Sequence, residues 1–271
     1  MKKKRLIPIL LFKDGNLVQA HNFKFYQNLG NPEIAVKRLS EWGSDELIYL
    51  DISNKRYNIG RADKKYKASS NFLSVIKKFS KFSFMPTTIG GKIKSLKDVE
   101  KRLLVGADKI SVNTSVLINP QLISEVAKEF GSQCVVISID VKKINNKYRI
   151  FYNHGTELSH YSLEEWLKII YNNGAGEVLI NSIDRDGSKK GYDINLLKLV
   201  TKFSKLPVIA CGGVGKFNHF YEGFKKTNID AAAAANIFHY SDQSVFLAKN
   251  YLYEKKIKVR KPNLLNINQY D

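Results

Sequence analysis

Short apolar runs alternate with amphipathic stretches along the whole chain of 271 residues, and this alternation constrains the fold more than any other feature. Each run is too short for a helix and almost continuously apolar, which is typical of parallel strands buried on both faces. The predicted strands are Leu6–Phe12, Glu46–Ile52, Phe84–Ile89, Lys109–Val112, Cys134–Asp140, Glu177–Asn181, Pro207–Cys211 and Ala231–Ala235. The predicted helices are Pro32–Trp42, Phe72–Phe79, Leu96–Val105, Pro120–Phe130, Ser162–Asn173, Ile194–Phe203 and Phe217–Lys226.

Eight such strands alternating with helices over this length indicate an α/β fold, a single (β/α)8 TIM barrel. The alternative is a doubly wound open sheet, which requires a glycine-rich fingerprint after its first strand. The segment Phe12-Lys13-Asp14-Gly15-Asn16 does not supply that fingerprint, so the barrel is favoured.

An internal repeat supports the barrel. Residues 72–81 resemble residues 196–205, and each copy leads to a strand and then to a double glycine, Gly90-Gly91 or Gly212-Gly213. The two halves are offset by roughly 122 residues, with no linker between them. We therefore predict one domain over residues 1–271, built from two similar half-barrels, with a basic insertion loop around residues 53–71.

The charge balance, 44 basic against 25 acidic residues, gives a net charge of +19. The lysines are scattered, and no nucleic-acid-binding motif accompanies them, so a lysine-rich surface is favoured over a nucleic-acid site. Cys134 and Cys211 lie in apolar runs and are expected to be buried and reduced. No apolar run is long enough for a membrane span, and the histidines lack metal-ligand spacing. We expect a cytoplasmic protein with no metal site, no cofactor and no membrane insertion.

Glycines and small polar residues follow the predicted strands in both halves. In a barrel of this kind the functional groups stand where the strands end, and double glycines there let backbone N–H groups approach an anion. Two phosphate-binding cups, and hence a phosphorylated small-molecule substrate, are predicted. The first cup comprises Gly90, Gly91, Asn113 and Thr114; the second comprises Asp186, Gly187, Gly212, Gly213, Ala235 and Asn236.

Asp140 closes the apolar fifth strand. A partly buried carboxylate at this point is a candidate general acid or base, because burial raises its pKa toward neutrality. A helix cap or a loop salt bridge is the structural alternative. Asp51 and Asp184 end other strands in a similar way.

The chain also resembles the HisF family, the cyclase subunits of imidazole glycerol phosphate synthase. The resemblance runs from about residue 5 to residue 260. The segments that carry it are Ile7-Pro8 with Lys13-Asp14-Gly15, Asp45-Glu46-Leu47 with Leu50-Asp51-Ile52, Gly106-Ala107-Asp108-Lys109 with Ser111-Val112-Asn113-Thr114, Phe130-Gly131-Ser132-Gln133, Ser182-Ile183-Asp184-Arg185-Asp186-Gly187 and Ile237-Phe238-His239.

The resemblance implies a HisH-like glutaminase subunit bound at the bottom of the barrel, with ammonia passing through the barrel to a site at the top. It also implies an ammonia gate formed by Arg5, Glu46, Lys109 and Glu177, and it places Asp108 and Gln133 at the glutaminase interface. A ring of charges that merely closes the bottom of the barrel is the structural alternative.

The top of the barrel departs from the family pattern. Leu11 stands where the family has a catalytic aspartate paired with the residue matching Asp140, Gln19 replaces a phosphate-binding lysine, and Lys92 replaces a glycine. This combination resembles the HisF-like branch (WbuZ-type) that supplies ammonia to a separate sugar amidotransferase in surface-polysaccharide synthesis. The resemblance therefore favours acetamidino-sugar formation, with a working histidine-pathway cyclase and a non-catalytic scaffolding barrel as alternatives.

Overall fold

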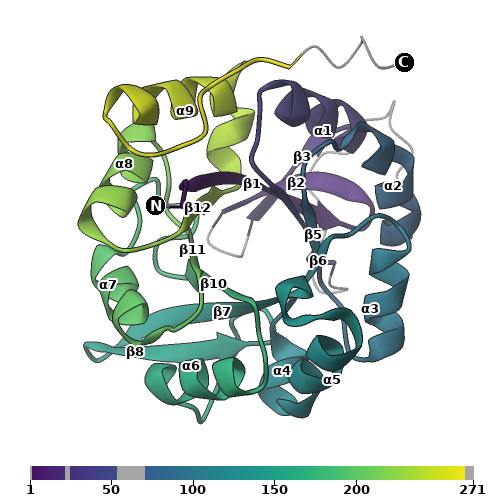
Figure 1. Cartoon of the computed structure of the whole chain (residues 1–271), viewed down its shortest axis with the longest axis vertical. Coiled ribbons are helices and arrows are strands. Elements are labelled where there is room, and N and C mark those ends of the chain that lie inside the picture. Colours follow the sequence, from purple (N-terminus) through teal and green to yellow (C-terminus); the bar gives the residue numbers. More distant parts are fainter. Residues whose placement is uncertain (1, 22–24, 54–70, 266–271) are drawn as a thin grey trace.

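A computed structural model describes residues 2–21, 25–53 and 71–265 of the chain. Within these ranges, eight parallel strands form a closed ring in which β1 pairs with β12 and β4, and β10 pairs with β7 and β11. Figure 1 shows this ring surrounded by helices. The strands are β1 (Arg5–Lys13), β4 (Leu47–Asp51), β5 (Thr87–Gly90), β6 (Lys109–Val112), β7 (Val135–Ile144), β10 (Glu177–Ser182), β11 (Val208–Cys211) and β12 (Ala231–Ala234). The predicted (β/α)8 barrel is confirmed.

Side-chain caps begin several of the helices. Ser95, Ser162 and Asp193 each accept a hydrogen bond from a backbone N–H in the first turn of the helix that follows. The helices are α1 (Pro32–Glu41), α2 (Phe72–Phe79), α3 (Leu96–Leu103), α4 (Thr114–Ile118), α5 (Gln121–Phe130), α6 (Leu163–Asn172), α7 (Ile194–Phe203), α8 (Phe217–Lys226) and α9 (Ser244–Glu254), with 3-10 turns η1 (Ser80–Phe82), η2 (Ser132–Cys134) and η3 (Asn236–His239). No helix among the described residues is long and apolar enough to cross a membrane.

The strands bury both faces, as their apolar runs predict. Along β1, Leu6, Leu10 and Phe12 belong to a large cluster between the strands and the helices. The alternate residues Ile7 and Ile9 belong to a separate inner cluster, because successive side chains of a strand point to opposite faces. That inner cluster fills the barrel with Ile7, Ile9, Ile48, Val136, Leu179, Ile209, Ala231 and Ala233.

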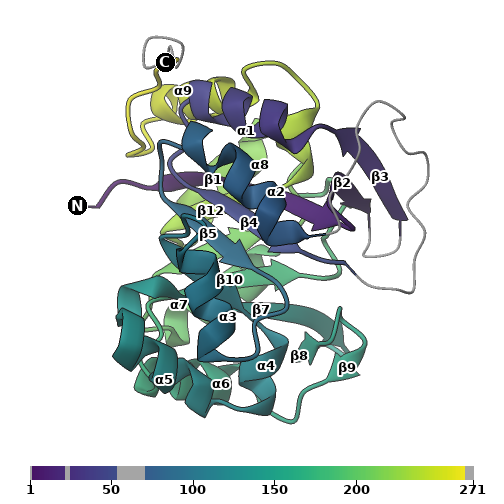
Figure 2. The same ribbon diagram turned by 90° about the vertical axis from the view of Figure 1, so that its right-hand side faces the viewer.

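Two antiparallel extensions rise from the end of the barrel at which the strands finish, which we call the mouth (Figure 2). One is the hairpin of β2 (Asn16–His21) and β3 (Phe25–Gly30), which follows β1. The other begins in β7 and continues through β8 (Lys147–Tyr152) to β9 (Glu157–Leu158). Asn145 and Asn146, both with positive φ, form the turn after β7. Neither extension was predicted from the sequence, and the predicted end of β7 at Asp140 was too early.

Several other expected strand limits were wrong, most by a single residue. Phe84 does not begin a strand: β5 starts at Thr87, after Pro86, and Phe84 is 57% exposed. Cys134 lies in η2 rather than in β7. The basic insertion expected at 53–71 lies, apart from its two end residues, outside the described residues.

Candidate functional site

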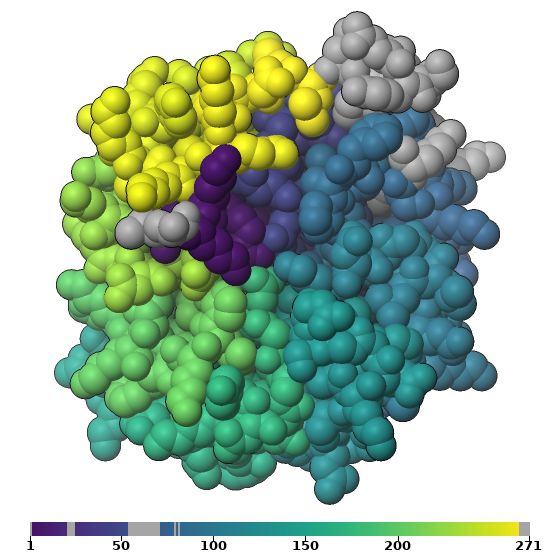
Figure 3. Space-filling model, in the orientation of Figure 1, coloured from purple at the N-terminus to yellow at the C-terminus, as the bar shows by residue number. Residues whose placement is uncertain are grey.

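Four charged residues close the base of the barrel, the end at which the strands begin. Arg5 bridges two carboxylates: its Nη1 lies 2.5 Å from Oε1 of Glu46, and its Nη2 lies 2.6 Å from Oε1 of Glu177. Lys109 contacts the other oxygen of each, at 3.2 Å and 2.8 Å respectively. The structure thus joins all four residues predicted as a gate into one charged ring. Figure 3 shows this face, where atoms fill the centre of the molecule.

The charged ring is internally neutral, with two cations and two anions. Burial alone would raise the pKa of Glu177, but the hydrogen bond and charge of Arg5, followed by those of Lys109, hold it below its usual value. Burial by itself would lower the pKa of Arg5. The hydrogen bonds and charges of Glu177 and Glu46 outweigh the effect of burial, and together they raise the pKa of Arg5. Arg5 and Glu177 therefore stay ionised at neutral pH, and the ring presents a charged barrier beneath the apolar interior.

The base also carries the two residues predicted at a protein interface. Asp108, just before β6, accepts a hydrogen bond from the Thr87 N–H at 2.7 Å and is exposed, as is Gln133 in η2. Two apolar side chains that the sequence analysis did not select stand at this end too. Phe84, ahead of β5, is 57% exposed, and Leu104, at the end of α3, is 77% exposed.

At the mouth, Asp140 lies between two asparagines. The Nδ2 of Asn113 donates to Oδ2 of Asp140 at 2.7 Å, and the Nδ2 of Asn181 donates to Oδ1 at 3.0 Å. Burial raises the pKa of Asp140 above its usual value, against the opposing effect of the Asn181 and Asn113 hydrogen bonds. Asp140 is thus a buried carboxylate with a raised pKa, as general acid–base work requires.

The rest of the floor of the mouth is apolar. Leu11 continues the inward series of β1 after Ile7 and Ile9, and it packs on the inner cluster together with Leu50, Cys211 and Ala235. Burial, and then the charges of Asp186 and Asp140, raise the pKa of the Cys211 thiol, so this cysteine stays protonated. At position 11, Leu11 offers neither a proton donor nor an acceptor to the mouth.

Some residues of the first predicted cup bond to neighbouring elements of the protein instead of facing a ligand. A Cβ added to Gly91 would overlap the backbone oxygen of Asp51, so only glycine fits this close approach. Asn113, however, is bonded to Asp140, and the Thr114 hydroxyl accepts from the Asn153 N–H at 3.1 Å. Asn113 and Thr114 therefore connect the cup to neighbouring elements.

The second predicted cup is held by backbone contacts. Gly212 and Gly213 both have positive φ, and the Gly191 N–H donates to the oxygen of Gly213 at 2.7 Å. Asn236 donates its Nδ2 to the oxygen of Ala20 at 2.8 Å and so joins η3 to the first hairpin. The remaining predicted members, Asp186, Gly187 and Ala235, follow β10 and β12 at the same end of the barrel.

The other two strand-end carboxylates have structural partners. Asp51 pairs with Lys92, 3.2 Å away, and Asp184 accepts the Lys143 N–H at 2.7 Å. Among the described residues, no group of three histidine, cysteine, aspartate or glutamate side chains is placed to hold a metal ion.

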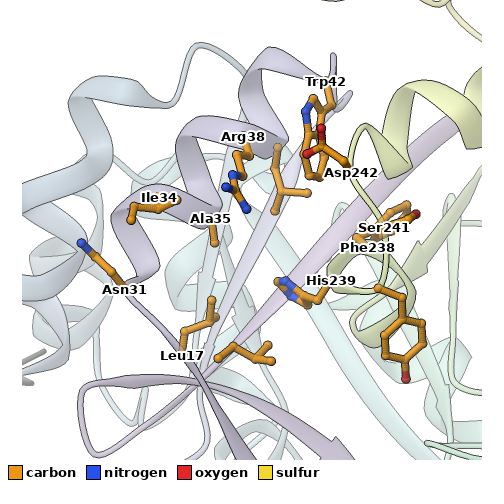
Figure 4. Close-up of a pocket in the computed structure, with 13 residues that line it drawn as sticks. Leu17, Asn31, Ile34, Ala35, Arg38, Trp42, Phe238, His239, Ser241 and Asp242 are labelled. Atoms are coloured by element: carbon orange, nitrogen blue, oxygen red, sulfur yellow. The ribbon is translucent and has the colours of Figure 1, made fainter. Parts of the chain in front are cut away.

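A cavity of about 350 Å³ lies behind the first hairpin, between α1 and the segment after η3. Figure 4 shows His239 pointing into it from η3, with Arg38 and Trp42 of the α1 segment around it. Burial lowers the pKa of His239 to about 4, so the ring is uncharged at neutral pH. The sequence pattern gave this histidine no role of its own; it was part of the segment Ile237-Phe238-His239.

The chain is a (β/α)8 barrel with a charged ring at its base and a buried carboxylate at its mouth, and residues 5–244 match the family described as "Histidine biosynthesis protein". The chain is 40% identical over 260 residues to the imidazole glycerol phosphate synthase subunit HisF of Natranaerobius thermophilus, and 39% and 40% identical over 261 residues to those of Bacillus cereus and Hydrogenobaculum sp.. Each comparison covers 96% of this chain and 100% of the relative. The chain belongs to the HisF family.

Proposed function

We propose that this chain is the ammonia-using barrel subunit of a two-subunit glutamine amidotransferase of the imidazole glycerol phosphate synthase type. The charged ring of Arg5, Glu46, Lys109 and Glu177 is the observation that carries this proposal. A buried ring of four charges is a costly way to close a barrel that apolar side chains would close as well. The presence of the charged ring is explained by a gate that blocks ions and opens for a small neutral molecule.

Ammonia generated at the base has to remain neutral to cross the barrel. The interior above the ring is lined by side chains such as Ile7, Ile48 and Leu179, in which an ammonium ion would lose its hydration without compensation. Asp140 stands above this lining, where a nucleophile leaving the barrel would meet a substrate held at the mouth. In this proposal a HisH-like glutaminase binds the base, at the surface that includes Phe84, Leu104, Asp108 and Gln133.

The first candidate for the fate of the ammonia is the cyclase reaction of histidine biosynthesis, with a phosphorylated substrate in the two cups. The names and full-length coverage of the relatives support this reading more than the polysaccharide reading that the sequence analysis favoured. Asp140, with its raised pKa, is then the general acid or base of the mouth. The active enzyme is expected in the cytoplasm as a single-domain subunit.

The second candidate is delivery of ammonia to a separate sugar amidotransferase. Leu11 favours it, because this inward position of β1 holds an apolar side chain that can take no part in the proton transfers of ring closure. In that case the barrel serves as a conduit, and another protein completes the chemistry.

One experiment separates the candidates. The purified chain is given the ribulosyl substrate of the cyclase family with excess ammonium salt, and substrate consumption is followed. Consumption at a rate typical of the family supports the cyclase. No consumption by the folded protein, together with stimulation of a HisH glutaminase, supports the conduit. If the folded chain neither consumes the substrate nor stimulates a HisH glutaminase, the proposal is contradicted, and a scaffolding barrel is the remaining alternative.

The gate itself is tested by coupling. Lys109→Met breaks the charged ring, and we expect less substrate consumed per glutamine hydrolysed while consumption with free ammonium persists. Lys97→Met, which removes an exposed lysine from α3, is the matched control and should leave the ratio unchanged. An unchanged ratio in Lys109→Met would mean that the ring is only a structural closure.

A further inference from the structure

Lys92 has an unusual backbone conformation for its residue type. It follows Gly91 directly after β5, at the mouth, and its φ is +55°. A left-handed conformation costs a residue with a side chain about 1 kcal/mol relative to glycine. Non-glycine residues held in this way concentrate at ligand-binding sites, so the lysine side chain itself requires an explanation.

The ammonium group of Lys92 is held in place yet remains accessible. Its Nζ lies 3.2 Å from Oδ2 of Asp51; the side chain of Lys92 is 56% exposed and that of Asp51 is 7% exposed. Asp51 also accepts hydrogen bonds from the N–H and the hydroxyl of Ser53. Because an ammonium group has three donors, the contact with Asp51 orients Lys92 and leaves donors for a second anion.

Two side-chain hydrogen bonds hold the backbone on either side of Lys92 in place. Arg102, 5% exposed, donates from Nη2 to the oxygen of Gly91 at 2.5 Å, and the Ser115 hydroxyl donates to the oxygen of Ile93 at 2.6 Å. In a trans peptide the N–H points opposite to the C=O, so the Lys92 N–H points away from Arg102. This N–H has no acceptor among the described residues.

We propose that Lys92 binds a phosphate group of the substrate at the first cup, through its ammonium group and its backbone N–H. The inference rests on the proposed phosphorylated substrate and goes beyond it by naming the cation that holds one phosphate. Gln19, where the family resemblance places a phosphate-binding lysine, carries no charge and donates to the Tyr240 hydroxyl at 3.0 Å. Lys92 thus supplies at the mouth a positive charge that Gln19 does not.

The test is a titration of the whole chain with inorganic phosphate, followed by 1H–15N NMR. The Gly91 amide reports on the first cup, and the Gly212 and Gly213 amides report on the second cup in the same sample. In Lys92→Gly we expect phosphate to bind the first cup about five- to tenfold more weakly, since a charge-assisted contact is lost. The second cup should be unaffected, and Lys92→Arg should retain affinity at the first.

Lys256→Gly is the matched control. Lys256 is also an exposed left-handed lysine, with φ +61°, and it lies beyond α9 near the base, where the Lys4 N–H donates to the oxygen of Lys258. The control changes charge and backbone in the same way and should leave the titration as in the unaltered protein. Unchanged affinity at Gly91 in Lys92→Gly, with phosphate still binding the second cup, overturns the role of Lys92 but not the proposed substrate class. No phosphate response at either cup in the unaltered chain overturns both.

Discussion

Asn181 donates its side-chain amide to Oδ1 of Asp140 at a distance of 3.0 Å, across the neighbouring strands β10 and β7. The two residues are register partners, and the remaining carboxylate oxygen is held in the same way by Asn113. Asp140 is therefore a fixed acceptor in the floor of the mouth, and its charged form is stabilised by two amide donors.

Replacing Asn181 tests this contact. In Asn181→Leu the ionised carboxylate loses one donor, so the pKa of Asp140 should rise further, and the free energy of unfolding should fall by about 1–3 kcal/mol. Carboxyl 13C NMR measures the pKa, and urea unfolding measures the stability. Asn113→Leu should shift the pKa in the same direction. A pKa of Asp140 that stays the same in both variants would contradict the two-donor description.

Replacing Arg5 tests the charged ring. Arg5→Met leaves two buried carboxylates with only Lys109 between them, and we expect a loss of about 3–5 kcal/mol in unfolding free energy. The pKa of Glu177 is held below its usual value of 4.5, so its contribution is present above pH 4.5 and is lost as the pH falls below that value. Urea unfolding between pH 3 and pH 7 should show a weaker acid dependence in Arg5→Met. An equally steep dependence would exclude Arg5 as the stabilising partner.

His239 predicts a second pH dependence. Burial lowers its pKa from 6.5 to about 4, so the unfolded chain binds a proton more readily than the folded protein does. Stability is therefore complete above pH 6.5 and declines as the pH falls toward 4, by up to about 3 kcal/mol. His239→Gln should flatten this part of the stability curve. His160→Gln, at an exposed position, should leave it unchanged. The prediction fails if both variants follow the unaltered protein.

Gly213 tests the second cup. Its φ is +97°, and a Cβ there would overlap the carbonyl oxygen of Gly191, so Gly213→Ala should cost at least about 2 kcal/mol. Gly155→Ala is the comparison, because Gly155 has φ +74° but only the Cδ1 of Ile183 near an added Cβ, at 3.3 Å. That change should cost only about 1 kcal/mol. Thermal unfolding measures the loss of stability in both variants. Equal losses would show that the backbone around Gly213 moves freely to accommodate the added Cβ.

Leu11→Asp tests the chemistry of the mouth. If the missing carboxylate alone limits ring closure, this change should create or raise consumption of the ribulosyl substrate with free ammonium, by about 10²–10⁴-fold, the usual contribution of a positioned acid or base. Leu11→Asn has nearly the same shape without an ionisable group and should give no gain. Equal rates in both variants would place the obstacle in the substrate cups.

The sequence by itself determined the barrel and several of its local features. The apolar runs predict strands buried on both faces, and the double glycines mark close backbone contacts that no larger residue allows, as Gly91 and Gly213 confirm. Ser162 and Asp193 begin helices through contacts a few residues away. These features depend on neighbouring residues, so pattern and residue type are sufficient to predict them.

Only the tertiary structure decided which distant groups meet. Arg5 and Glu177 lie 172 residues apart and come within 2.6 Å because the strand ring closes. The pairing of Asp140 with Asn113 and Asn181, and that of Lys92 with Asp51, likewise depend on strand register and loop path. The physical reason is that burial and hydrogen-bond geometry, which set the charge state of each of these groups, arise from packing between elements rather than from any one segment.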